Sequence, residues 1–366
     1  MRLRRILIGV LAPAFALILA ILVSSLALLL IGKNPLTAFT EMMKFGTRLD
    51  SLIFMVNQAL PLFLSGLAVA VGFKMGLFNI GVEGQYTLAA LLAAYVGGQL
   101  HLPAVIHVLV IMLVAMVAGS LWAGIAGVLK VWRGVHEVIS TIMLNAIATR
   151  ALVPYLLATY LAQQNQPGDF VIKTKTIPGS GLLPTLATAR GTELFGFLPI
   201  AILVGVGFYL LVWRTRFGYD LRASGYNPDA ARVSGVDPKA MILKTMLISG
   251  AIAGLVGIPQ LLGFFNRYGI DFTQNLGFTG IAVALVGRNH PVGIALAALL
   301  FGFLDRSSQI LDLEAVPKEI VIIMTGVIVL SVVIAYEVVR RVLEAQEVKA
   351  AAERTKRLAR TAEATA

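Results

Sequence analysis

Cysteine is absent from the 366 residues of this chain, and charged residues are scarce. Without cysteine there is no disulfide framework and no thiolate metal site. The four histidines are too scattered for the paired spacing of a metal-binding helix: His101, His107, His136 and His290. Charged residues make up 13% of the chain, against about 25% in a typical soluble domain. A disulfide-stapled secreted domain and an ordinary soluble fold are therefore both excluded.

Hydrophobic residues take the place of the missing charge. They make up 58% of the chain, and the mean hydropathy is +0.86. A chain this apolar has too little polar surface to cover itself in water, so lipid must be its solvent. The composition predicts an all-α fold, a polytopic transmembrane helical bundle.

A membrane helix needs about 20 mostly apolar residues. Ten stretches qualify as spans, of which the eighth and ninth are shorter: Ile6–Ile31, Ser51–Val71, Phe78–Gly98, Ala104–Leu129, Val138–Ala162, Gly196–Trp213, Met241–Gly263, Leu276–Gly287, Pro291–Leu304 and Pro317–Tyr336. The first run is too long for the core of a signal peptide, so we expect a retained span. An even number of crossings puts both termini on one side.

The net charge of +11 sets the orientation. Twenty of the thirty Lys and Arg residues fall on the side of the termini, nine fall on the other side, and Arg150 falls within a span. Basic residues concentrate at the cytoplasmic face of membrane proteins. We therefore expect a multi-pass protein of the plasma (inner) membrane with both termini in the cytoplasm. The basic residues lie between apolar runs rather than along one face of a soluble fold, so nucleic acid is not an expected partner.

Two segments share a pattern of Asn, an aliphatic residue, Gly, two variable residues and Gly. They run from Asn79 to Gly84 and from Asn275 to Gly280, and the predicted topology gives them opposite directions. This indicates an inverted-topology repeat with broken helices, and such repeats place the solute path at their interface. The alternative is helix packing by small residues. The predicted divisions are a first span and outer segment (1–50), a first repeat (51–162), an outer loop (163–195), a sixth span with a cytoplasmic loop (196–240), a second repeat (241–336) and a charged cytoplasmic tail (337–366).

Polar side chains within the spans are the candidate lining of a path. An ionisable group in hydrocarbon costs about 2.5–3.5 kcal/mol or more, so it should face protein or a wet cavity. Arg150 either pairs with Glu83 or a helix end, or lines the path; Glu83 either lines the path or favours a helix N-terminus. Asn57, Gln58 and Gln260 also fall within spans. The path candidates are Asn79, Glu83, Gln85, Asn145, Arg150, Asn275 and Thr279.

The loop from Trp213 to Lys244 carries start and stop signals for a short helix. Asn227 suits the N-cap, Pro228 the first helical position and Gly235 the left-handed residue after the end. Such an element either docks in a groove of a soluble partner or is an ordinary interfacial helix. The residues expected to act in docking are Arg222, Asn227, Pro228, Ala230, Ala231, Arg232 and Gly235.

Four ordered segments resemble the membrane subunits of ATP-binding-cassette importers for ribose, branched-chain amino acids and nucleosides. They are GLFNIGVEGQ from Gly76, HEVISTIMLN from His136, RASGYNPDAARVSGVD from Arg222 and GIAVALVGRNHPVGIALAALLFG from Gly280. The family usually has Asn where this chain has His136. The first two and the last are most similar to nucleoside or simple-sugar permeases. The resemblance covers residues 50–335.

The resemblance implies a transport subunit for a nucleoside or sugar-like solute, with four kinds of partner: a cytoplasmic ABC ATPase, a second and paralogous permease subunit, an extracytoplasmic solute-binding lipoprotein and the bilayer. The chain has no G-x-x-x-x-G-K-[ST] loop, so we expect no cofactor on this chain and ATP use by the partner. Two rival classes are an ion-driven secondary transporter, with Glu83 as its carboxylate, and an intramembrane enzyme.

Overall fold

The computed structural model describes residues 28–163 and 171–313, together with residues 18, 19 and 21–26 and isolated positions between 323 and 341. It contains two compact units, Lys44–Ser307 and Met1–Met43 with Ser308–Ala366. The predicted first span and last span lie largely outside the described residues, and the charged tail lies almost wholly outside them. The sites described below all lie in Lys44–Ser307.

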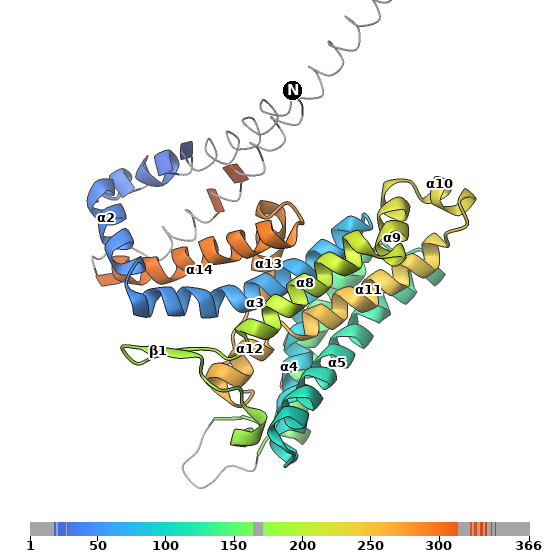
Figure 1. Ribbon diagram of the computed structural model, residues 1–366, viewed down its shortest axis with the longest axis horizontal. Coiled ribbons are helices and arrows are strands. Elements are labelled where there is room, and N and C mark those ends of the chain that lie inside the picture. Colours follow the sequence, from blue (N-terminus) through green and yellow to red (C-terminus); the bar gives the residue numbers. More distant parts are fainter. Residues whose placement is uncertain are drawn as a thin grey trace, which may run out of the picture. The chain divides into compact units, whose positions relative to one another are not determined.

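Helices dominate the chain (Figure 1). In order they are α2 Pro35–Gly46, α3 Leu49–Lys74, α4 Val82–Gln99, α5 Ala104–Arg133, α6 Glu137–Ile147, η1 Ala148–Leu152, α7 Val153–Leu156, η2 Leu157–Leu161, η3 Gly179–Gly181, α8 Leu198–Arg214, α9 Arg216–Tyr226, α10 Pro228–Val233, α11 Pro238–Gly254, α12 Ile258–Gln260, η4 Leu261–Phe265, α13 Leu276–Val286 and α14 Pro291–Leu313. Segments η1, η2 and η4 are π-helical, and η3 is a 3₁₀ turn.

Five helical stretches among the described residues are long and apolar enough to cross a membrane: Leu49–Lys74, Ala104–Arg133, Glu137–Leu161, Pro238–Phe265 and Pro291–Leu311. Each coincides with a span predicted from hydropathy. The number rises to as many as seven if each of two bent helix pairs is one span, and α13 is a shorter apolar helix. The prediction of a helical membrane protein is confirmed, whereas ten crossings and the inverted repeat stay predictions.

A short hairpin departs from the all-α expectation. Strand β1 (Ala187–Ala189) pairs antiparallel with β2 (Thr192–Leu194) through a two-residue turn in which Arg190 and Gly191 have φ of 49° and 80°. Positive φ at both turn positions matches the twist of a hairpin. Three residues per strand are too few to produce a period-2 signal in the sequence. The hairpin lies at the end of the bundle opposite α9 and α10 (Figure 1).

Helices α5 and α11 pack against each other through glycines. A Cβ on Gly250 would overlap with the carbonyl oxygen of Gly119, and a Cβ on Gly254 would overlap with that of Ala115. In a bilayer the lipid tails are as apolar as the side chains, so close backbone approach rather than hydrophobic exclusion holds such helices together. These glycines therefore set the distance between α5 and α11.

We predict that Gly250→Ala separates α5 from α11, because backbone rather than a flexible side chain blocks the new methyl group. The expected cost is about 1–3 kcal/mol, the range for overpacking. It is measured as a lower melting temperature in detergent. Gly207→Ala on α8 is the matched control, since nothing lies within 4 Å of its Cβ position. Equal melting temperatures for the two variants would contradict the prediction.

Candidate functional site

Asn79 lies in the turn between α3 and α4 and is fully buried. Its Oδ1 accepts from the Gly81 amide at 2.9 Å, and the carboxamides of Asn79 and Gln85 pair with each other at 3.0 and 3.1 Å. Its Nδ2 also donates to the Ser249 hydroxyl at 2.9 Å, which in turn donates to the Ala68 carbonyl at 2.6 Å. Asn79 therefore joins α3, α4 and α11, and its hydrogen-bonding capacity is used inside the chain.

Glu83, in the first turn of α4, is buried at 5% exposure. Its carboxylate accepts from the backbone amides of Asn275 at 2.6 Å and Gly277 at 2.8 Å, and from the Tyr86 hydroxyl at 2.9 Å. The first amides of a helix have no partner within the helix. Glu83 supplies that partner for α13, and its negative charge suits a helix N-terminus. Of the two interpretations of Glu83, the helix-end charge is supported, but the helix is α13 as well as its own.

The second asparagine, Asn275, is the N-cap residue of α13 but does not cap it through its side chain. Asn275 adopts a left-handed backbone with φ of 67°, and its side chain makes no capping bond. The Glu83 carboxylate takes that place. The two asparagines of the matching segments therefore do different work, although both segments begin a helix.

Asn145 joins α6 to the same place. Its Oδ1 accepts from the Gly84 amide at 2.8 Å, and its Nδ2 donates to the Ile80 carbonyl at 2.7 Å. We call this buried set the polar joint; its members are Asn79, Glu83, Gln85, Asn145 and Ser249. The structure thus brings together four of the predicted path residues. It also adds Ser249 and Tyr86, which sequence reasoning missed; the only signal for Tyr86 is its position three residues after Glu83.

The other three predicted path residues face outward. Arg150 is exposed on η1, Asn275 is exposed, and Thr279 is half-buried with its hydroxyl donating to the Asn275 carbonyl at 2.9 Å. None of the ion pairs among the described residues joins Arg150 to Glu83, whose donors are named above. The pairing alternative for Arg150 and Glu83 is therefore wrong.

The face that carries Arg150 differs from its neighbour α5. The exposed residues of α5 between positions 104 and 125 are all apolar, as expected against lipid. The run from α6 to η2 exposes apolar residues such as Ile142 and Met143, and toward its end it also exposes Arg150, Tyr155, Thr159 and Tyr160. It also contains two π-helical segments, which are frequent at functional sites. A charged side chain in hydrocarbon is costly, so this face must be covered by protein or water.

The loop between α8 and α11 forms two helices at one end of the bundle (Figure 1). Asn227 caps α10, accepting from the amides of Asp229 at 3.1 Å and Ala230 at 3.0 Å, and Gly235 follows with φ of 84°. Asp237 caps α11 through the Lys239 amide at 2.9 Å. Every start and stop signal read in this loop is confirmed.

Only part of α10 is available to a partner. Ala230 is exposed, but Ala231, which was also expected to act in docking, is buried against its own chain at 3% exposure. A helix of six residues has one face against its own protein. Tyr226, at the end of α9, and Val233, the last residue of α10, have exposures of 94% and 90%. The Arg222 guanidinium bonds the Val212 carbonyl at the end of α8, which leaves it a structural role in this state.

His136 stands where the family usually has Asn, and it keeps the capping role of that position. It is the N-cap of α6, and its Nδ1 accepts from the Val138 amide at 3.4 Å. The next residue, Glu137, pairs with Lys130 at 2.5 Å and accepts from the Phe78 amide at 3.4 Å. An imidazole nitrogen therefore does here what an asparagine oxygen does at other N-caps.

A cavity of about 480 Å³ with both polar and apolar lining lies between the first half of α3, the hairpin and the α12–η4 segment. Its polar lining includes Gln58, Gln260 and Asn57, and its apolar lining includes Phe54, Phe195 and Phe264. Asn57 holds the hairpin in place, donating to the Glu193 carbonyl at 2.7 Å and accepting from the Phe195 amide at 3.0 Å. The sequence places these amides in spans, but nothing in it brings position 58 beside position 260.

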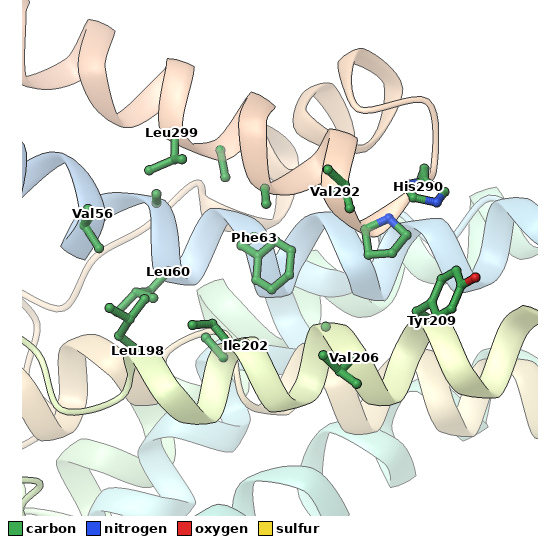
Figure 2. Close-up of a pocket in the computed structure, with 16 residues that line it drawn as sticks. Val56, Leu60, Phe63, Leu198, Ile202, Val206, Tyr209, His290, Val292 and Leu299 are labelled. Atoms are coloured by element: carbon green, nitrogen blue, oxygen red, sulfur yellow. The ribbon is translucent and has the colours of Figure 1, made fainter.

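A second cavity, of about 460 Å³, is apolar and lies between α3, α8 and α14 (Figure 2). Figure 2 shows Phe63 in its middle and Tyr209 and His290 at one end. The His290 ring packs on Tyr209 and Trp213 with centroids 6.3 and 5.3 Å apart. A lining without hydrogen-bond partners along its length does not suit a polar solute.

Comparison with known proteins gives one family and several relatives. The family model for the permease component of branched-chain amino acid transport systems matches residues 51–334. The guanosine ABC transporter permease protein of Bacillus subtilis is 36% identical over 90% of this chain and 94% of its own. A glucose permease protein of Haloferax volcanii is 33% identical over 88% and 86%. A nucleoside permease protein of Lactococcus lactis is 29% identical over 93% and 95%. No solved structure matches.

The chain therefore belongs to the family of permease components of branched-chain amino acid transport systems, and it is a membrane transport subunit of the ATP-binding-cassette class. The family match begins and ends close to the limits inferred from the four sequence segments. It contains both the polar joint and the α9–α10 loop.

We predict that Glu83→Gln destabilises the fold, because one carboxylate oxygen becomes an NH₂ group facing a backbone amide. A buried donor without an acceptor costs about 1–3 kcal/mol. The measurement is the melting temperature in detergent. Exposed Glu193→Gln, on the hairpin, is the control. A melting temperature for Glu83→Gln equal to that of the control would contradict the capping of α13 by Glu83.

Proposed function

We propose that this chain is the permease subunit of an ABC importer that carries a nucleoside across the plasma membrane into the cytoplasm. The observation that carries the solute class is the similarity over nearly the whole length to a guanosine permease and a nucleoside permease. The proposal includes ten crossings, both termini in the cytoplasm, a cytoplasmic ATPase, a paralogous second permease and an extracytoplasmic binding lipoprotein.

The path is proposed to run along the face from α6 to η2, against the second permease. Two observations support this placement. The hydrogen bonds of the polar joint are made inside the chain, so the joint holds helices together and does not solvate a moving solute. Arg150 and two tyrosines, in contrast, are exposed within a helical stretch long and apolar enough to cross a membrane. A wet path covers them without the desolvation that lipid imposes.

A sugar is the second candidate solute. The glucose permease relative supports it, since its identity and coverage are close to those of the guanosine permease. An ion-driven secondary transporter is disfavoured because the Glu83 carboxylate, the one suitable candidate, is engaged by three donors at a helix start.

The test is uptake by proteoliposomes that contain this chain, its partner permease and the ATPase, with the binding protein outside. We expect ATP-dependent accumulation of tritiated guanosine, and none when the P-loop lysine of the ATPase is replaced. Accumulation of glucose but not guanosine would select the sugar alternative. Uptake by this chain alone under a proton gradient would select the secondary transporter.

Coupling to the ATPase is assigned to α10 and its flanks. We predict that Tyr226→Ala with Val233→Ser weakens co-purification of the ATPase at least tenfold and lowers solute-stimulated hydrolysis. Burying such side chains contributes about 1.5–3 kcal/mol each, and both are exposed here. Leu113→Ala, on the apolar face of α5, is the control because it removes exposed apolar area away from the loop. Normal co-purification and stimulation in the double variant would mean that this loop is not the docking element.

A further inference from the structure

Gln260, in the wall of the cavity between α3, the hairpin and η4, has a buried acceptor with no partner among the described residues. Its side chain is 5% exposed, and its Oε1 makes no hydrogen bond among the described residues. A buried polar atom left unpaired costs about 1–3 kcal/mol. Such an atom in a cavity wall is explained when the cavity's occupant supplies the missing donor.

The identity of the free atom follows from its neighbours. The Gln260 Nε2 donates to the Gln58 Oε1 at 3.1 Å, and the Gln58 Nε2 donates to the Asp305 Oδ2 at 3.2 Å. A carboxylate accepts and cannot donate. Asp305 therefore orients Gln58, and Gln58 orients Gln260, so that an oxygen rather than an NH₂ group is left at the end. The orientation of an amide is otherwise ambiguous, but this relay has a fixed direction.

The rest of the lining indicates the shape of the occupant. Phe54, Phe195 and Phe264 contribute aromatic rings to the same cavity. Gly263 makes room for Phe195, because a Cβ there would lie 2.6 Å from the ring. Aromatic faces favour a flat, conjugated partner and supply no hydrogen bonds. A planar ring with an N–H at its edge satisfies both features, whereas a sugar ring satisfies only the acceptor.

We propose that this cavity is a binding site for the nucleobase of the solute, separate from the path proposed along α6 to η2, and that Gln260 Oε1 accepts a hydrogen bond from a ring N–H of the base. The inference rests on the proposed nucleoside transport and adds the residue that recognises the base through a hydrogen bond. A site built to bond a polar group rejects an analogue that lacks it, because the protein's own atom is then left unpaired.

The cavity is also connected to the polar joint. Thr273 lines the cavity, and its carbonyl oxygen lies 3.0 Å from the Tyr86 hydroxyl, whose single proton is shared between this carbonyl and the Glu83 carboxylate. The same hydroxyl bonds the Glu83 carboxylate, which holds the amides of Asn275 and Gly277. The wall that follows η4 and the start of α13 are therefore fixed by one set of bonds.

The experiment measures uptake of tritiated inosine by the assembled importer, with competition by 1-methylinosine and by 2′,3′-dideoxyinosine. The first competitor lacks the ring N–H and the second lacks the sugar hydroxyls. We expect Gln260→Met to lower the apparent affinity for inosine and dideoxyinosine about tenfold, the value of one good hydrogen bond. The affinity for 1-methylinosine should change less than twofold.

Asp305→Asn is the second variant, and it leaves the cavity residues in place. An asparagine can donate to Gln58, so the relay loses its fixed direction and inosine loses its advantage over 1-methylinosine. Asp305→Glu keeps an acceptor and should keep the preference.

Equal losses for all three solutes in Gln260→Met, or an unchanged preference in Asp305→Asn, would overturn the inference. A loss confined to solutes with sugar hydroxyls would assign Gln260 to the ribose instead. Failure of the unaltered importer to take up any nucleoside would refute the proposed function itself.

Discussion

Every backbone amide that enters hydrocarbon needs a hydrogen-bond partner, and Glu83 meets that need where α13 begins inside the bundle. Its carboxylate binds two amides of the incoming segment and the hydroxyl of Tyr86. A helix that starts at depth is otherwise an unsatisfied end. The Tyr86 hydroxyl also lies 3.0 Å from the Thr273 carbonyl, and Gly280 of α13 packs closely on Ser65.

The same constraint separates residues that hold the fold from residues that meet the solute. Amides whose partners are all internal, such as Asn79 and Asn145, cannot release them to a passing molecule without a cost of about 1–3 kcal/mol for each bond lost. Polar groups that are exposed at depth, such as Arg150, or buried without a partner, such as the Gln260 oxygen, are incomplete in the isolated chain. The candidate contacts with the solute and the partner subunit are therefore the polar groups that lack a hydrogen-bond partner within the chain, rather than all polar groups.

The limits of sequence reasoning show in two pairs of similar residues. Asn79 and Asn275 open matching segments, yet Asn79 is fully hydrogen-bonded and buried while Asn275 is exposed with a left-handed backbone. Ala230 and Ala231 are neighbours in a capped helix, yet one is exposed and the other buried. Local propensity identifies the start of a helix. It does not say which face of the helix is covered by other segments, because that depends on contacts between residues far apart in the sequence.

The sequence by itself determined the membrane class, the five long apolar helices, the caps of α10 and α11 and the family, because hydropathy, capping and motif order are local properties. Only the tertiary structure decided that Glu83 caps α13, that Asn145 reaches α4 and that Gln58 and Gln260 share one cavity. These relations join positions 61 to 202 residues apart. Their partners are chosen by helix packing, in which backbone approach at glycines fixes which side chains meet.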